Sequence, residues 1–303
     1  MTSEQSSQNR LSYREGKHRL RSIRWMLFFI VATQTLVTVA ANMISSFFSN
    51  PPPVYLQMLI IELLAYLLPL SLYARENRLL TAREARERFG LRDFRPWLLP
   101  LVILAGFGCQ FMMIVLDLPM SLLLKISDGY IPQNPWELAA AMVVIAIIPA
   151  VFEEFLLRGI VYGVMAEFNT TAAAVFTTVM FALMHGSAAG FFGYLFLGIV
   201  LVFVLRRTGS LYACMALHLV NNVTALLLSY FSGGLLQTPL ATIGLFCLGA
   251  AIFGLAWFGM AICTKPDSRV KVIKTSDFLG QSFVNLPILL CIAGILGLMF
   301  IQY

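Results

Sequence analysis

Two adjacent glutamates and an arginine stand in an otherwise apolar stretch of the sequence. Glu153, Glu154 and Arg158 lie within the run 137–163, where most other residues are aliphatic or aromatic. On a helix Glu154 and Arg158 lie four residues apart on one face, whereas Glu153 points about 100° away from its neighbour. A structural ion pair needs one acid, so the spacing predicts a Glu154–Arg158 pair and leaves Glu153 as a candidate general base.

Histidines add a second set of candidate residues. His18 lies in the basic N-terminal segment, where we expect it to be solvated, but His185 ends a Phe-Ala-Leu-Met-His run and His218 opens a His-Leu-Val-Asn-Asn run. His218 and Asn222 are four residues apart and share one helix face. A lone buried histidine is often a hydrogen-bonded packing residue, but two of them beside a glutamate pair favour a polar site. Glu62, in another apolar stretch, could line the same site or hydrogen-bond between helices.

Composition shows which elements must position these residues. Of the 303 residues, 59% are hydrophobic and 12% are charged, against roughly 45–50% and 25% in soluble domains. Since a membrane helix needs about 20 apolar residues, we expect an all-α, polytopic transmembrane bundle of about eight to nine spans. The fifth and sixth segments could instead bend or tilt together. The approximate spans are 25–48, 54–74, 97–118, 137–163, 170–187, 188–205, 211–231, 239–263 and 283–303.

Basic residues predict the orientation of these spans. Lys and Arg favour cytoplasmic loops, and an N-terminus inside places 19 of the 21 Lys and Arg residues in inside loops. The sequence therefore predicts a basic cytoplasmic tail at 1–24, a membrane domain at 25–303 and a C-terminus outside. The expected location of the protein is the cell membrane. The net charge of +6 is explained by this topology, so no nucleic-acid partner is expected, and the lipid bilayer is the expected surrounding.

The motifs together resemble those of a known family. A Glu-Glu-x-x-x-Arg motif at 153–158, Phe-x-x-x-His at 181–185 and His-x-x-x-Asn at 218–222 follow one another on three predicted spans. This order is similar to that of the CAAX protease and bacteriocin-processing (CPBP, or Abi) intramembrane proteases, which include the CAAX prenyl endopeptidases and proteins like lysostaphin resistance protein A. The resemblance covers about residues 137–230, which would form the catalytic core.

The resemblance implies a hydrolase that cuts a peptide bond in or near the membrane. Glu153 would be the general base, His185 would hold and polarise the water, and His218 with Asn222 would stabilise the oxyanion, with Glu154, Arg158 and Phe181 in support. The family has also been described as metalloproteases, in which case Glu153, His185 and His218 would bind a catalytic zinc. We prefer the metal-free mechanism and leave zinc as the alternative.

Other functions remain open from the sequence. A transporter or proton carrier could use the same buried polar groups as a relay, although no second proline-plus-acid helix matches the segment 145–158, as paired half-helices would require. A catalytically silent immunity or scaffold protein could retain the fold. The expected partner is a peptide or membrane-protein substrate, whose identity, like the oligomeric state, is not set by the sequence.

Overall fold

The computed structural model of the protein describes residues 3–47, 52–76, 86, 89–125, 130–232, 238–265 and 275–302. These residues form helices joined by short turns, and no strand occurs among them. The predicted all-α, polytopic membrane architecture is confirmed. Apolar side chains face outward along much of the bundle, as Phe47, Leu122 and Leu255 do with exposed fractions of 82%, 69% and 72%, which is appropriate only where lipid replaces water.

Seven helical segments are long and apolar enough to cross a membrane, and the number rises to eight if one bent pair is counted as a single span. The long helices are α1 (Ser3–Ser46), α2 (Val54–Glu76), α4 (Leu99–Leu124, preceded by the 3-10 turn η1, Pro96–Leu98), α9 (Phe191–Thr208), α10 (Leu211–Phe231) and α11 (Pro239–Cys263). The seventh is a composite helix over Pro135–Ala166. These counts refer to the part of the chain that the structure describes.

Two predicted spans differ from regular membrane helices. The fifth is α8 (Thr170–Met184), which has 15 residues and is about 22 Å long, shorter than a bilayer core of about 30 Å. The ninth is the bent pair α12 (Thr275–Phe283) and α13 (Leu286–Gln302), whose two parts meet at 64°. Asn285 lies at this bend and its side chain accepts from the Ile288 amide at 3.3 Å, which caps the start of α13.

The composite helix carries the glutamate pair and departs twice from α-helical geometry. It consists of α5 (Pro135–Ala141), the π-helical segment η2 (Met142–Ile147), α6 (Ile148–Glu154), a second π-helical segment η3 (Phe155–Val161) and α7 (Tyr162–Ala166). Asn134 caps its start by accepting from the Glu137 amide at 2.9 Å. The backbone stays helical through Pro149. π-helical turns are frequent at functional sites. Their position on both sides of Glu153 and Glu154 therefore makes this segment a candidate functional site.

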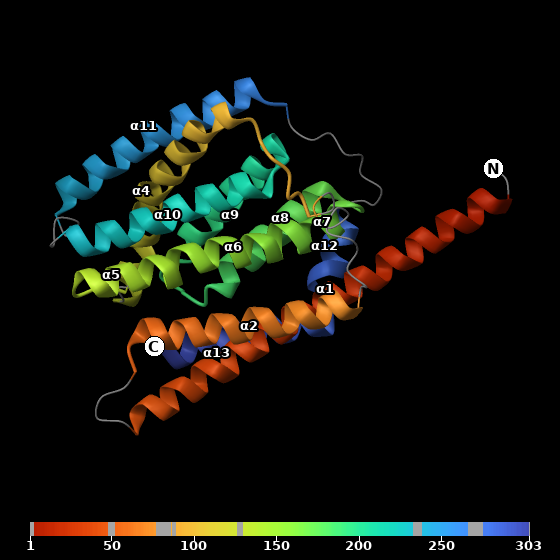
Figure 1. Ribbon diagram of the computed structural model, residues 1–303, viewed down its shortest axis with the longest axis horizontal. Coiled ribbons are helices and arrows are strands. Elements are labelled where there is room, and N and C mark those ends of the chain that lie inside the picture. Colours follow the sequence, from red (N-terminus) through yellow and green to blue (C-terminus); the bar gives the residue numbers. More distant parts are fainter. Residues whose placement is uncertain are drawn as a thin grey trace.

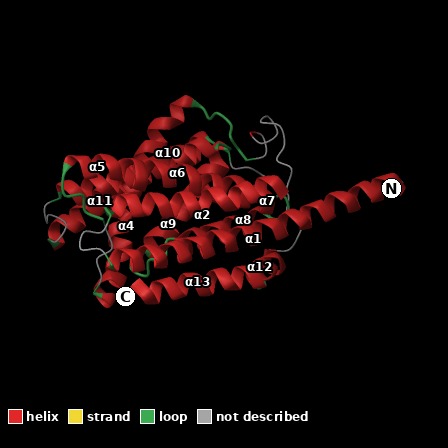
Figure 2. Cartoon of the chain, turned by 60° about the horizontal axis from the view of Figure 1, so that its bottom comes forward, coloured by secondary structure: helices red, strands yellow, loops and turns green. Residues whose placement is uncertain are grey.

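Helices pack around the composite helix on both sides (Figure 1). On one side α1 packs against α2 and α13, and on the other α4 packs against α10, α11 and α9. The middle of the composite helix contacts α10, α2 and α8. It is therefore enclosed by neighbours, whereas α1 projects beyond the bundle at its N-terminal end (Figure 2).

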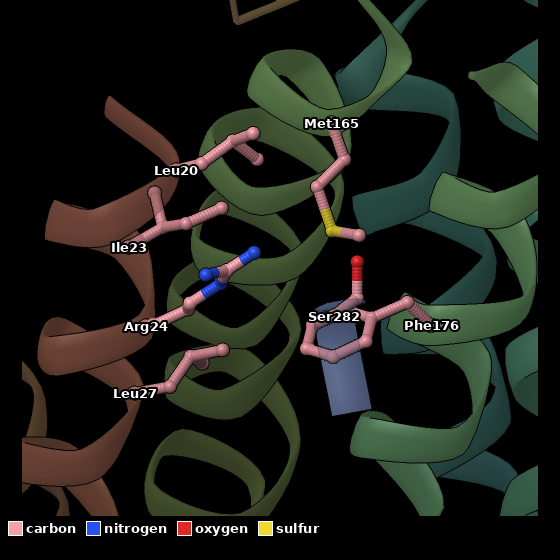
Figure 3. A pocket seen from close by; sticks show the side chains of 7 residues that line it. All are labelled: Leu20, Ile23, Arg24, Leu27, Met165, Phe176 and Ser282. Atoms are coloured by element: carbon pink, nitrogen blue, oxygen red, sulfur yellow. The ribbon is translucent and has the colours of Figure 1, made fainter. Parts of the chain in front are cut away.

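A small cavity lies apart from the glutamate pair, where α1, α7, α8 and α12 meet (Figure 3). Its volume of about 10 Å³ suffices for one water molecule. The Arg24 side chain points into it from α1. Besides Arg24, the cavity is lined by Leu20, Ile23, Leu27, Met165, Phe176 and Ser282.

Candidate active site

A buried charge network joins two of the three motifs. Arg158 donates from Nη1 to Glu154 Oε1 at 3.0 Å, and both side chains are 0% exposed. This is the pair that the i, i+4 spacing predicts, and it is confirmed. His218 donates from Nδ1 to the same Glu154 oxygen, also at 3.0 Å. Glu154 thus accepts hydrogen bonds from two partners on different helices. The hydrogen bond from His218 fixes the rotation of the His218 ring.

Arg158 has two further contacts that hold it in place. Its Nη2 donates to the Gly198 carbonyl on α9 at 3.4 Å, and its guanidinium carbon lies 4.3 Å from the centre of the Phe181 ring, a cation–π contact. Gly198 packs against α8 so tightly that a Cβ there would lie 3.3 Å from the Thr178 backbone. Arg158 therefore links the composite helix to both α8 and α9.

Glu153 and His185 form the more open half of the site. The distance between Glu153 Oε2 and His185 Nε2 is 3.8 Å, and their side chains are 16% and 18% exposed. On the other side of its ring, His185 donates from Nδ1 to the Phe181 carbonyl at 2.7 Å. A neutral imidazole that donates from Nδ1 keeps Nε2 as an acceptor. Hence an acceptor nitrogen faces a carboxylate oxygen across a gap too wide for a direct hydrogen bond.

Phe181 connects the two halves. Its ring makes edge contacts with His185 and with His218, with ring centres 4.6 and 5.5 Å apart, and it carries Arg158 on its face. Phe181 is 0% exposed. The structure thus brings Glu153, Glu154, Arg158, Phe181, His185 and His218 together in one cluster.

Asn222 lies on the same helix as His218, but the contact found for it was not expected. Its amide donates to the Ile145 carbonyl in η2 at 3.2 Å. Pro149 has no N–H, so this carbonyl lacks the donor that an α-helix would supply four residues later. Asn222 provides a replacement donor for this carbonyl.

Sequence reasoning missed a tyrosine on α2. The Tyr66 hydroxyl donates to Glu153 Oε1 at 3.5 Å, and its ring stacks on Phe152 with centres 6.1 Å apart. Glu62, one turn earlier on α2, is close enough to Glu153 to interact electrostatically, and its Oε2 is buried without a hydrogen-bond partner among the described residues. The signal was the i, i+4 spacing of Glu62 and Tyr66, which places both on one helix face.

Sequence reasoning also missed Tyr194, which packs against the His185 ring. Tyr194 on α9 stacks on the His185 ring with centres 3.7 Å apart. The start of α9 is held by Asp117 of α4, whose Oδ1 accepts from the Gly193 amide at 2.7 Å. A carboxylate at a helix N-terminus is favourable because it satisfies a free amide and the helix dipole. An aspartate in an apolar helix was the available signal, but its partner lies 76 residues away.

The zinc alternative was tested against these positions. No group of three His, Cys, Asp or Glu side chains that could hold a metal ion occurs in the described ranges. The described donors therefore do not fit a three-ligand zinc site.

Comparison with known proteins adds a family to this geometry. The model of the family described as type II CAAX prenyl endopeptidase Rce1-like matches residues 135–224, which span the composite helix, α8, α9 and most of α10. Comparison with curated proteins and with solved structures gives no match. The family match agrees with the resemblance carried by the three motifs: residues 135–224, the segment that contains all three, are similar to the Rce1-like type II CAAX prenyl endopeptidases, a family of proteases.

Proposed function

We propose that this protein is an intramembrane endopeptidase in which Glu153 and His185 activate the attacking water. The observation that carries the proposal is the 3.8 Å separation of Glu153 Oε2 and His185 Nε2. Glu153 Oε2 is buried and has no hydrogen-bond partner among the described residues. A water beside both atoms would donate one hydrogen to each and direct a lone pair outward, which suits a nucleophile held by a general base.

The reaction would proceed in two steps. Water oxygen attacks the substrate carbonyl carbon as Glu153 takes one of its protons, giving a tetrahedral oxyanion. Glu153 then returns this proton to the amide nitrogen, and the C–N bond breaks to release an amine and a carboxylic acid. The acid then passes its proton to the amine, giving a carboxylate and an ammonium group. Holding water and carbonyl at contact distance removes the entropic cost of bringing them together in solution.

Oxyanion stabilisation is assigned to His218 and Asn222. His218 can donate to the oxyanion from Nε2 only as an imidazolium, because Nδ1 already donates to Glu154. The second amide hydrogen of Asn222 would complete a donor pair on one helix face.

The family description supplies a substrate class for this proposal. A type II CAAX prenyl endopeptidase acts, by that description, on a prenylated C-terminal peptide. A prenylated peptide is thus the first substrate to test on this chain, and an unprenylated membrane peptide is the second.

The experiment compares cleavage by three forms of the protein in detergent micelles. The native chain should cleave a fluorogenic prenylated peptide, and Glu153→Gln should lower kcat by about 10²–10⁴ because it removes the base. Glu76→Gln is the control, since Glu76 is an exposed glutamate on α2 and the change should leave kcat unaltered. Equal cleavage by the native and Glu153→Gln forms would rule out the mechanism.

A further inference from the structure

A large groove lies on the outer face of the bundle, between α8, α9 and α11. Its volume is about 520 Å³, within the usual range of ligand sites. Its apolar wall includes Val175 and Ile199, which are 41% and 50% exposed. In a protein that spans the membrane, side chains exposed at this position face lipid tails.

Contacts between helices form the floor of the groove. Phe203 of α9 stacks on Trp257 of α11 with ring centres 3.5 Å apart and planes at 13°. Elsewhere on the floor Thr178 of α8 packs against Gly198 of α9. The groove is therefore built by contacts between helices and does not depend on one flexible side chain.

Two arginines at the end of α9 give the groove a charged end. Arg207 donates from Nη1 to the Ala261 and Thr264 carbonyls at 3.0 and 2.7 Å, and so caps α11. Arg206 also lines the groove, but its side chain makes no hydrogen bond or ion pair with the described residues. Both occupy the last turn of α9, where a membrane helix reaches the headgroup region.

We propose that this groove binds an anionic phospholipid, with an acyl chain along the apolar wall and the phosphate against Arg206. The occupant must match an apolar groove that ends at Arg206, a cation that pairs with no acidic side chain among the described residues. A peptide would leave its backbone amides and carbonyls without partners along this wall, whereas an acyl chain has none to satisfy. A phosphate group supplies the negative charge that would pair with the Arg206 guanidinium.

Trp257 makes the site directly measurable. The protein has four tryptophans, and changing Trp25, Trp97 and Trp136 to Phe leaves Trp257 as the reporter. Bromine on an acyl chain quenches a neighbouring indole. The reporter protein is placed in phosphatidylcholine nanodiscs that contain increasing fractions of either brominated phosphatidylglycerol or brominated phosphatidylcholine. The ratio of the two lipid fractions that give half-maximal quenching is the relative affinity of the groove for the two lipids.

We expect brominated phosphatidylglycerol to reach half-maximal quenching of Trp257 at about one fifth of the lipid fraction that brominated phosphatidylcholine needs. This is the preference expected from one basic residue near a membrane surface. Arg206→Gln should remove this preference and Arg206→Lys should retain it. Arg95→Gln, at an exposed arginine outside the groove, should retain it too. Equal quenching by both lipids, or an unchanged preference in Arg206→Gln, would overturn the proposal. Because the readout is binding, it does not depend on peptidase activity.

Discussion

Removing the carboxylate of Glu154 should unfold the protein more easily, and removing Arg158 as well should reverse most of that loss. Glu154→Leu leaves the 0% exposed Arg158 guanidinium without its anion. Its remaining contacts are the Gly198 carbonyl at 3.4 Å and the Phe181 ring, and its Nε has no partner among the described residues. Breaking one side of a buried ion pair costs about 3–5 kcal/mol.

The double variant Glu154→Leu, Arg158→Met replaces the pair with apolar side chains of similar size. Such replacements are often neutral or stabilising, because no charge then has to be held away from water. We therefore expect the double variant to lie within about 1–2 kcal/mol of the native protein. Its peptidase activity should nevertheless fall by about 10²–10³, because His218 Nδ1 loses the acceptor that orients its ring.

Stability is read from thermal unfolding in detergent micelles, and activity from cleavage of the fluorogenic peptide. The exposed pair of His18 and Glu76, 3.6 Å apart and more than half exposed on each side, is the control. Glu76→Leu should change the free energy of unfolding by less than about 1 kcal/mol. A double variant no more stable than Glu154→Leu would refute the stability role assigned to the ion pair, and a double variant that cleaves at the native rate would refute its role in orienting His218.

Three further predictions concern neighbouring contacts. Tyr66→Phe removes the hydroxyl that donates to Glu153 and should lower kcat by about two- to tenfold with KM unchanged; a fall in KM alone would contradict this role. Gly198→Ala brings a Cβ to 3.1 Å from Thr178 Cγ2 and should lower the free energy of unfolding by about 1–3 kcal/mol, whereas Gly254→Ala, with nothing within 4 Å, should not. Treatment with phenanthroline should leave cleavage intact, and loss of activity with recovery on adding zinc would favour the metal mechanism.

Hydropathy predicted most of the helical architecture because the cost of exposing backbone polar groups to lipid leaves few alternatives. The span predicted at 137–163 is found at Pro135–Ala166, and the one at 188–205 is α9, Phe191–Thr208. What hydropathy could not show is where a span is short or broken. Asn169 and the Gly186 turn limit α8 to 15 residues, since local caps and turns act on one or two residues and barely alter a hydropathy average.

Contacts within one helix could be predicted, and contacts between helices could not. The i, i+4 rule gave the Glu154–Arg158 pair. The His218–Glu154 hydrogen bond joins residues 64 apart and the Tyr66–Glu153 bond residues 87 apart. Many packings of the same spans would satisfy the hydrophobic pattern equally, so the pattern does not select which polar faces meet. The assignment of catalytic roles stays a prediction until Glu153→Gln is assayed.

The shortness of α8 ties this site to the thickness of the host membrane. A helix of about 22 Å that begins at one surface ends roughly 8 Å before the other side of a 30 Å hydrocarbon layer. For a helix α8 that begins at one surface, we expect His185 and the non-helical turn up to Gly190 to lie within the layer, where such backbone requires protein or water around it. A thicker bilayer would lengthen the path that water travels to Glu153, and a thinner one would shorten it. The mismatch between helix length and bilayer thickness should therefore affect kcat. Membranes of different lipid composition should support different hydrolysis rates by the same chain.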